Sequence, residues 1–412
     1  MDAHIDYERL YRDTIPSVVS IYVGRRAPAM GAGSGFVYDV VGPGDGGSDS
    51  DSDADSNVNS DSDANTVADG DAGDAGRITA TSEATDVTGY VVTNEHVVSG
   101  VTDVELRFAD GQWRTGRVVG RDGYTDLAVV SVPGFPAGIR PLPVAGENPT
   151  PGRPVAALGN PLGLDGSVTA GIVSGANRSM PTSGGFAVPD VVQTDAPINP
   201  GNSGGPLVAV AVGGGTAGAD GDVGTDMDGN GSGNRDGDVT EGGHGNATAA
   251  TPSYEVVGVN RARQGDNIGF AISPAIVTRV VPSLIDEGRY RHSYLRTRTL
   301  DVTPTVAEAN GLDEPQGVLV VDVATGPAAG DRLRRSTGTR TVRGQRVPTG
   351  GDVIVGLNGR ELRSHEELMR YLITETRPRE PVEVDVIRDG EQRTLSVVLG
   401  ERPDPDGRIP VN

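Results

Sequence analysis

The sequence contains neither cysteine nor lysine among its 412 residues. Without cysteine, the chain has no disulfide bonds, thiolate nucleophile or cysteine-ligated metal. No run of 18 consecutive apolar residues occurs, so no helical membrane span is predicted. The first residues, MDAHIDYERLYRDTIP, lack a basic start followed by an apolar run. The sequence therefore predicts a cytoplasmic chain without a signal peptide.

The formal net charge of −22 comes mostly from two stretches of the chain. Residues 42–87 carry eleven Asp and one Glu against one Arg, and residues 213–252 carry six Asp and one Glu against one Arg. Both are rich in Gly and Ser or Thr and have little to bury, so they are predicted to be disordered inserts. The remaining chain is only mildly acidic, which argues against a nucleic-acid partner. Arginine as the only strongly basic residue, with excess Asp, fits either adaptation to molar salt or a GC-rich coding bias.

Short apolar runs separated by turn signals fill most of the first 273 residues. Asp110-Gly111 separates two alternating runs and is a strong hairpin signal. A proline-rich connection at 133–154 is predicted to join two β-lobes. Each acidic insert interrupts a pair of strands, because the strand pattern resumes after it. The pattern predicts an all-β barrel or sandwich architecture.

A second, smaller unit is predicted after the β-rich part. Ser273-Pro274 is typical of a helix N-cap followed by Pro at the first helical position, and that helix should stop near Gly288. Residues 295–400 then contain four strand-like runs and one helix. Ser364 and Glu367 form a capping box at the start of that helix. The sequence predicts a small α+β domain here, with a tail at 401–412.

A serine framed by glycines is the strongest candidate for chemistry. Ser203 lies in Gly-Asn-Ser-Gly-Gly-Pro, where backbone N–H groups can converge beside a hydroxyl nucleophile. A serine needs a general base, and His96 alone among the five histidines follows an apolar strand within the β-rich part. Asp126 begins an apolar strand and is the candidate carboxylate that orients the imidazole. Asp122 and Asp103 are the competing carboxylates, both predicted to lie in solvated turns.

These three residues occur within motifs that resemble one protease family. The motifs, in order, are TNEHVV, DLAVV, GNPLGL, TAGIVS, TDAPINPGNSGGPL and IGFAIS. They resemble the HtrA (Deg) family of trypsin-like serine endopeptidases with C-terminal PDZ domains. The resemblance covers about 15–400 apart from the two inserts.

The resemblance implies a fold and its domain boundaries. It implies an all-β protease domain of two six-stranded-type, chymotrypsin-like β-barrels over 1–290, interrupted by the inserts, and a PDZ domain over 295–400. It also implies catalytic roles for His96, Asp126 and Ser203. The N–H groups of Gly201 and Ser203 would form the oxyanion hole, with Asn202 shaping the loop. An Asn at that position cannot form the ion pair that activates zymogens, so control by loop ordering is expected.

A specificity pocket and a peptide groove follow from the same resemblance. Ile198, with Arg263 from the loop before IGFAIS and Ile268 at the start of that motif, would line an apolar pocket. Arg261 and Arg263 depart from the family pattern and are predicted to point to solvent, or else to pair with acidic substrate. In the PDZ domain, edge N–H groups of the strand Gly317, Val318, Leu319 and Val320 would pair with a peptide C-terminus. The arginine-rich stretch 331–350 is longer than usual and is predicted to be a solvated loop.

The implied function is ATP-independent protein quality control by a serine endopeptidase that cleaves unfolded or damaged proteins. Its partners would be such proteins and, at the PDZ domain, peptide C-termini, and a homo-oligomer with the family precedent of a trimer is expected. The alternative is a chaperone or peptide-binding scaffold with little proteolysis. No cofactor is expected. No metal is expected either, because the EF-hand-like stretch beginning at Asp226 has Gly237 where a Glu is needed. Family members are often extracytoplasmic.

Overall fold

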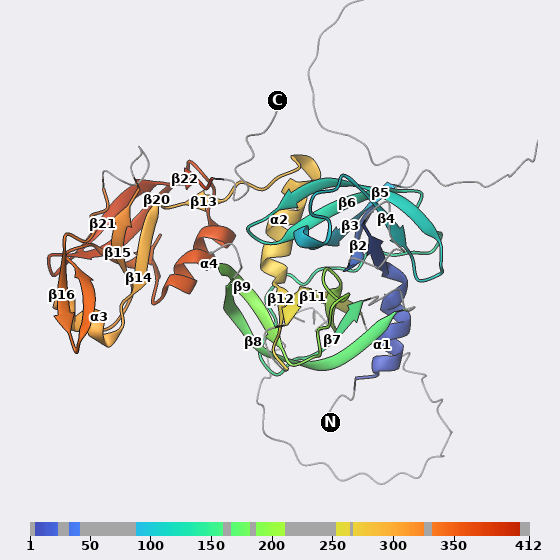
Figure 1. The fold of residues 1–412 in the computed structure, drawn as a ribbon, viewed down its shortest axis with the longest axis horizontal. Helices are drawn as coiled ribbons and strands as arrows, with labels where there is room; N and C mark the ends of the chain where they lie inside the picture. The colour runs from blue at the N-terminus through green and yellow to red at the C-terminus, as the bar shows by residue number, and fades with distance from the viewer. Residues whose placement is uncertain are drawn as a thin grey trace, which may run out of the picture.

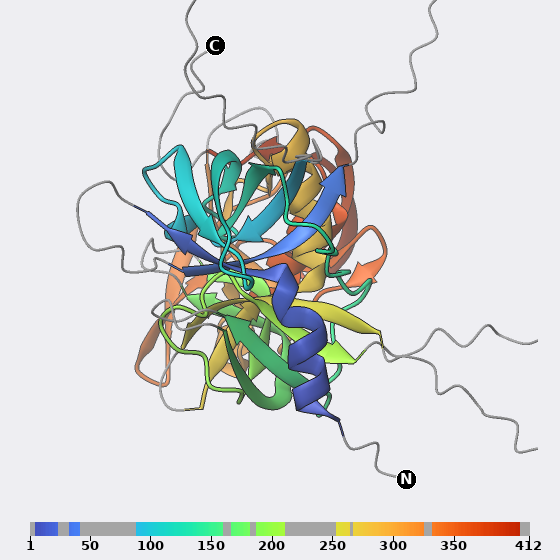
Figure 2. The same ribbon diagram turned by 90° about the vertical axis from the view of Figure 1, so that its right-hand side faces the viewer.

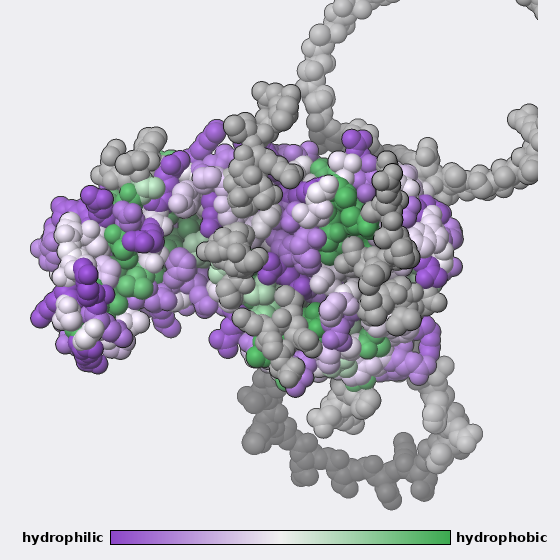
Figure 3. Space-filling view, in the orientation of Figure 1, coloured by the Kyte–Doolittle hydropathy of each residue, from purple (hydrophilic) through white to green (hydrophobic). Residues whose placement is uncertain are grey.

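The computed structural model describes residues 5–23, 33–41, 88–159, 166–181, 187–210, 253–263, 267–324 and 332–403. Two domains lie side by side in it, the β-barrels at the right of Figure 1 and the smaller domain at the left. The acidic inserts fall outside the described residues, so their predicted disorder stays a prediction. In the space-filling view of Figure 3, hydrophilic residues cover most of both domains and apolar residues form separate patches.

The first barrel closes from six antiparallel strands in the order β1-β2-β3-β6-β5-β4. Val37 of β2 pairs with Val91 of β3, so the first insert does separate two paired strands. Apolar side chains at alternate positions meet inside the barrel, as a half-buried strand pattern requires. The strands are β1 (Val18–Tyr22), β2 (Gly33–Val41), β3 (Thr88–Thr93), β4 (Asp103–Arg107), β5 (Trp113–Asp122) and β6 (Leu127–Pro133).

The second barrel also has six strands, in the order β10-β11-β12-β9-β8-β7, and it closes around its own apolar interior. Figure 2 shows the two barrels one above the other, with the N-terminal helix beside them. The predicted pair of six-stranded barrels is thus confirmed. The strands are β7 (Pro154–Gly159), β8 (Ser167–Pro181), β9 (Ala187–Thr194), β10 (Pro206–Val210), β11 (Tyr254–Arg263) and β12 (Gly269–Ile272).

Helices cover the outside of the barrels and join the two domains. Helix α1 (Tyr7–Thr14) is capped by Asp6, whose carboxylate accepts from the Arg9 N–H. Helix α2 (Pro274–Asp286) begins as predicted, with the Ser273 hydroxyl accepting from the Ile276 N–H. Its apolar face packs on strands of both barrels, β5, β6 and β11. This helix therefore helps to hold the barrels together before the chain leaves them.

The second domain contains helices α3 (Pro304–Asn310) and α4 (His365–Glu375) beside a sheet whose main path is β14-β15-β18-β20-β21. The predicted cap of α4 is present, because the Ser364 hydroxyl accepts from the Glu367 N–H at 3.2 Å. The strands are β13 (Ser293–Tyr294), β14 (Thr297–Asp301), β15 (Val318–Val323), β16 (Gly338–Val342), β17 (Gln345–Thr349), β18 (Val353–Leu357), β19 (Arg360–Glu361), β20 (Pro381–Arg388), β21 (Glu391–Val398) and β22 (Gly400–Glu401).

Two predictions for this domain are wrong. Part of the arginine-rich stretch is a hairpin, not a loop: β16 and β17 pair from Gly338↔Thr349 to Val342↔Gln345. Its two turn residues, Arg343 and Gly344, both have positive φ, which matches the twist of a two-residue hairpin. The predicted tail from 401 also begins inside a strand, because Glu401 of β22 pairs with Ser293 of β13.

The two domains contact each other through α4. This helix packs against β9 and α2 of the protease-like part. The Arg279 guanidinium of α2 donates to the Thr376 carbonyl at 2.9 Å, just beyond the end of α4. Ile373 of α4 belongs to the same apolar cluster as the residues under α2. The smaller domain is thus packed onto the barrels and not only tethered to them.

Candidate active site

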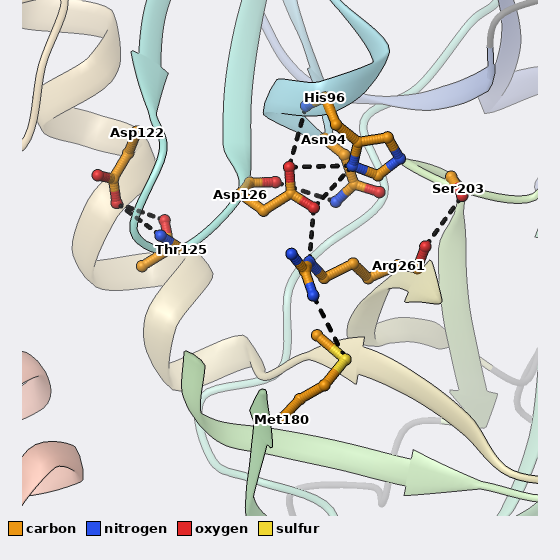
Figure 4. Close-up of polar contacts among 8 residues, drawn as sticks. All are labelled: Asn94, His96, Asp122, Thr125, Asp126, Met180, Ser203 and Arg261. Atoms are coloured by element: carbon orange, nitrogen blue, oxygen red, sulfur yellow. Dashed lines mark hydrogen bonds and ion pairs between the residues drawn. The ribbon is translucent and has the colours of Figure 1, made fainter. Parts of the chain in front are cut away.

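The structure brings the three predicted catalytic residues to the junction of the two barrels (Figure 4). His96 lies in the short 3-10 helix η2 (Glu95–Val97) after β3, and Asp126 lies in the turn between β5 and β6. Ser203 lies in the loop between β9 and β10 of the other barrel. His96 Nδ1 is 2.8 Å from Asp126 Oδ2 and 3.0 Å from Oδ1. The imidazole therefore presents its other nitrogen, Nε2, away from the carboxylate.

Asp126 is held by several donors in a backbone conformation that few residues adopt. Its φ is 59°, in the left-handed region that Asp tolerates better than most residues. Its carbonyl accepts from the Glu95 N–H at 3.1 Å and from the Asn94 side chain at 3.0 Å. Its carboxylate accepts from the His96 N–H at 3.0 Å. The turn thus ties the orienting acid to the segment that carries the base.

The electrostatics of this pair favour an ionised carboxylate. Burial of the Asp126 side chain, which is 5 % exposed, would raise its pKa. Hydrogen bonds and the charge of His96, with the charge of Arg261, outweigh burial and hold the pKa below its ordinary value. The His96 side chain is 48 % exposed, so its outer nitrogen is accessible.

The serine loop is built by contacts with the first barrel. The Ser34 N–H donates to the Ser203 carbonyl at 2.8 Å, and the Ser34 hydroxyl donates to the Gly201 carbonyl at 2.6 Å. Gly204 has φ of 84°, and a Cβ there would overlap the Ser34 carbonyl and the Thr93 hydroxyl. Gly204, directly after the serine, is therefore required by the fold of the loop.

The predicted oxyanion residues lie in the same loop. The Asn202 N–H donates to the Asn199 carbonyl at 2.9 Å, so it does not face the site. The Asn202 side chain is buried, with its amide oxygen 3.4 Å from the Ser167 hydroxyl, as expected of a residue that shapes the loop. Within the described residues no acceptor is assigned to the Gly201 or Ser203 N–H, which leaves both as candidate donors.

Arg261 occupies a place that the sequence did not predict. Its side chain is 17 % exposed and does not point to solvent, because its Nε lies 2.6 Å from Asp126 Oδ2. Its backbone carbonyl accepts from the Ser203 hydroxyl at 3.0 Å, whereas no hydrogen bond between Ser203 and His96 is present in the described part. One residue of β11 thus contacts both the acid and the nucleophile (Figure 4).

The predicted specificity pocket is only partly assembled by the described residues. Ile198 is buried and packs on Gly269, where a Cβ would overlap its side chain. Ile268 is 38 % exposed and is not packed beside Ile198 in the core. The side chain of Arg263 lies outside the described residues.

Asp122 forms a second buried acid–histidine pair that the sequence analysis missed. It was predicted to be solvated, yet Asp122 and His292 are 5 % and 6 % exposed. His292 Nε2 lies 2.9 Å from both carboxylate oxygens. Burial would raise the pKa of Asp122, but the charge and hydrogen bond of His292, with bonds from Thr125 and Tyr124, hold it below its ordinary value. The partners are too far apart in sequence for a local pattern to pair them. Asp103, the other competitor, is exposed as predicted.

The predicted peptide-binding strand of the smaller domain is not an edge strand. Val318 of β15 pairs with Asp301 of β14 on one side and with Ile354 of β18 on the other. The N–H groups of Gly317–Val320 therefore do not form the free edge of the sheet, and that prediction is wrong. The edge strands of this path are β14 and β21, and β14 is the one that lies beside α4.

A pocket of about 750 Å³ lies between β14 and α4. It is lined from the smaller domain chiefly by Leu295, Thr297, Thr299, Leu368, Met369 and Leu372. The barrels close one side of it with Ser179, Ala187 and Pro189. His365 at the start of α4 is bonded across it to the Thr299 hydroxyl at 2.8 Å.

Comparison with known proteins agrees with this architecture. Residues 79–213, which include all three candidate catalytic residues, match the trypsin-like peptidase domain family. Residues 296–399 match the PDZ domain family. A probable periplasmic serine endoprotease, DegP-like, from Halomonas elongata is 33% identical over 324 residues, which are 77% of this chain and 55% of that protein. In both domains the chain is similar to the HtrA (Deg) proteases.

Other HtrA relatives show the same extent of similarity. A DegP-like endoprotease of Rhizobium meliloti is 32% identical over 76% of this chain and 52% of its own length. The chain thus spans about half the length of these curated relatives. The solved HtrA-type protease AlgW with decapeptide has a TM-score of 0.59 and 22% identity, with 97% of this chain and 99% of that chain covered. This likeness supports the two-domain fold. Among the described residues, no helix is long and apolar enough to cross a bilayer.

Proposed function

We propose that the chain is a serine endopeptidase that cleaves unfolded or damaged proteins without ATP. The observation that carries this is the His96–Asp126 hydrogen bond beside Ser203, at the junction of two barrels of a trypsin-like domain. A serine, a histidine and an aspartate, the residue types needed for acyl transfer, lie close together there. The similar proteins are named serine endoproteases, which supports the same proposal.

In the proposed reaction, Ser203 Oγ attacks the carbonyl carbon of the scissile peptide bond while its proton moves to His96 Nε2. The Gly201 and Ser203 N–H groups stabilise the negative charge on the carbonyl oxygen. His96 then gives the proton to the leaving amine as the C–N bond breaks, and water hydrolyses the acyl-enzyme by the same route. Before attack, Ser203 must rotate its hydroxyl from the Arg261 carbonyl towards His96, a change between staggered side-chain conformers.

The test is cleavage of a labelled unfolded protein by the wild type, Ser203→Ala and the control Ser131→Ala. Ser131 is a half-buried serine in β6, away from the site. We expect Ser203→Ala to lower turnover by about 10⁶-fold and Ser131→Ala to leave it unchanged. Equal cleavage by Ser203→Ala and the wild type would overturn the mechanism.

A second function is favoured by the position of the Ser203 hydroxyl. It is bonded to the Arg261 carbonyl and not to the base, so the serine is not aligned for attack in this state, and binding without cleavage is the second candidate. The same assay with an aggregating substrate separates the two roles. Loss of cleavage in Ser203→Ala with retained suppression of aggregation would show a chaperone or scaffold role beside proteolysis.

We also propose that peptide C-termini bind along β14 in the groove beside α4. The exposed edge of β14 can pair with an added strand, and the apolar residues of α4 supply a side-chain pocket. The PDZ match supports peptide binding in general. Because Ser179 and Pro189 of the barrels line the same pocket, a bound peptide would touch the protease domain as well.

Location and assembly are proposed from the relatives. Those proteins are named periplasmic, which favours an extracytoplasmic location over the cytoplasmic one predicted from the sequence. A homo-oligomer, with a trimer as the family precedent, remains a proposal that the molecular mass in solution would test.

A further inference from the structure

Asp126 has two cationic or potentially cationic partners where the catalytic scheme needs one. His96 Nδ1 and Arg261 Nε approach the same oxygen, Oδ2, at 2.8 Å and 2.6 Å. Arg261 comes from β11 of the second barrel, whereas His96 and Asp126 belong to the first. Its guanidinium is held on its other side by Met180 of β8, whose sulfur lies 3.4 Å from Nη1. The guanidinium is thus held in place from both barrels.

The charge of Arg261 acts at short range. Its side chain is 17 % exposed and the carboxylate only 5 %, so water and salt screen the pair little. The charged groups that act on Asp126 among the described residues are His96 from η2 and Arg261 from β11. Asp122, four residues earlier, faces His292 instead. Glu95 is the neighbour of His96 in η2. It is unchanged in every variant considered below, so its charge cannot cause a difference between them.

We propose that Arg261 is a positioning residue that sets the basicity of His96 by sharing the Asp126 carboxylate. This rests on the proposed triad. An unshared carboxylate stabilises the imidazolium that forms when His96 accepts the Ser203 proton. A guanidinium on the same oxygen offsets part of that negative charge, so His96 binds a proton less tightly. The enzyme therefore keeps a neutral, functional base at lower pH than it would with Asp126 alone.

The sign of the effect gives a sharp test. Replacing Arg261 with a neutral residue removes a positive charge near His96, so the imidazolium should become more stable than in the wild type. The acid limb of kcat/KM for cleavage of a labelled unfolded protein should move up by roughly 0.5–1 pH unit in Arg261→Gln. Arg261→Lys keeps a cation on the same strand and should restore most of the wild-type profile.

Arg153→Gln is the matched control. Arg153 pairs with Glu255 at 2.6 Å and is 15 % exposed, so the control loses an ion pair of similar distance and burial outside the site. Its pH profile should match the wild type. A profile of Arg261→Gln that coincides with those of the wild type and Arg153→Gln would overturn the proposal.

A second measurement keeps the test decisive if the variant loses activity. The titration of the His96 ring is followed by NMR in full-length Ser203→Ala, with and without Arg261→Gln, after folding is verified by circular dichroism. A higher pKa of His96 in the double variant supports the proposal, and an unchanged pKa overturns it. This readout does not depend on cleavage, so failure of the protease mechanism would show separately, as residual activity of Ser203→Ala.

Discussion

Among single residues, Asp126 is held by polar contacts to both its carbonyl and its carboxylate. Its carbonyl and carboxylate accept hydrogen bonds from Asn94, Glu95 and His96, and its left-handed φ aims the carboxylate at the imidazole. Its proposed role is to orient His96 and to stabilise the imidazolium, and both actions depend on its negative charge. Its turn and the barrel junction provide a low-dielectric setting in which that charge acts strongly.

Asp126→Asn tests this role with nearly the same side-chain shape. The amide cannot hold His96 in the same tautomer or offset its charge, so kcat should fall by about 10⁴-fold. Asp103→Asn, an exposed carboxylate in β4, is the control and should behave as the wild type. A loss smaller than tenfold in steady-state cleavage of a labelled unfolded protein would contradict the role given to Asp126.

Local sequence chemistry singled out His96, Asp126 and Ser203, which the structure brings to one junction, because each lies in a motif with a turn or strand end. It did not predict the contacts of Arg261 with Asp126 or of His292 with Asp122. Arg261 lies in a strand, and whether a strand residue faces solvent or a neighbouring loop depends on the bulge between Asn260 and Ala262 in its pairing with β12. His292 is hydrogen-bonded to Asp122 although the two are 170 residues apart in the sequence, so no local pattern could predict the contact.

At the scale of elements, the position of β14 is the basis for the proposed peptide site. It precedes β15 in the chain and takes the edge position, so β15 becomes an interior strand. The sequence showed several strands and one helix for this domain, but strand order depends on long-range pairing. The hairpin β16–β17 was missed for a related reason, since its exposed arginines conceal a strand pattern in which only Val342 and Val347 are buried.

Met369→Glu tests the groove between β14 and α4. Met369 is half-buried and lines the pocket, so a carboxylate there would be desolvated by an apolar peptide side chain. The Kd of a fluorescent decapeptide with an apolar C-terminus should rise about tenfold or more. Arg340→Glu in the exposed hairpin introduces the same residue away from the pocket and should leave the Kd unchanged. Equal affinity of Met369→Glu and the wild type, measured by anisotropy, would rule out this site.

At the scale of the whole molecule, a buried acid–histidine pair joins the two domains near the candidate active site. Asp122 ends β5 and is followed by the turn that carries Asp126, while His292 lies in the segment between α2 and β13. The Arg402 N–H donates to the His292 carbonyl at 2.9 Å, and its guanidinium lies over the Tyr124 ring at 4.1 Å. The segments by which the chain enters and leaves the PDZ domain thus meet beside the turn that carries Asp126.

Asp122→Asn should weaken this joint and change the acid stability of the protein. The folded pKa of Asp122 is lowered, so its stabilisation is complete above the ordinary value of 3.8 and is lost as pH falls through the folded value. Near neutral pH the variant should lose about 3–5 kcal/mol, because it leaves a buried histidine without its acid. Below pH 4 the difference should shrink.

The fluorescence of Trp113, the single tryptophan, reports unfolding of the first barrel in urea at each pH. Asp313→Asn, an exposed carboxylate, is the control. A stability difference between Asp122→Asn and the wild type that is the same at pH 3 and pH 7 would contradict the assigned titration.

The short ladder between β13 and β22 has a mechanical consequence. Because Ser293–Tyr294 pairs with Gly400–Glu401, the polypeptide enters and leaves the PDZ domain at one point. Tension applied between the barrels and residue 403 would load this two-residue ladder and the Tyr124–Pro403 hydrogen bond before it reached the PDZ sheet. The ladder would act as a clasp that opens under a small load, while the core of the PDZ domain stays folded and the contacts of α4 with β9 and α2 remain in place.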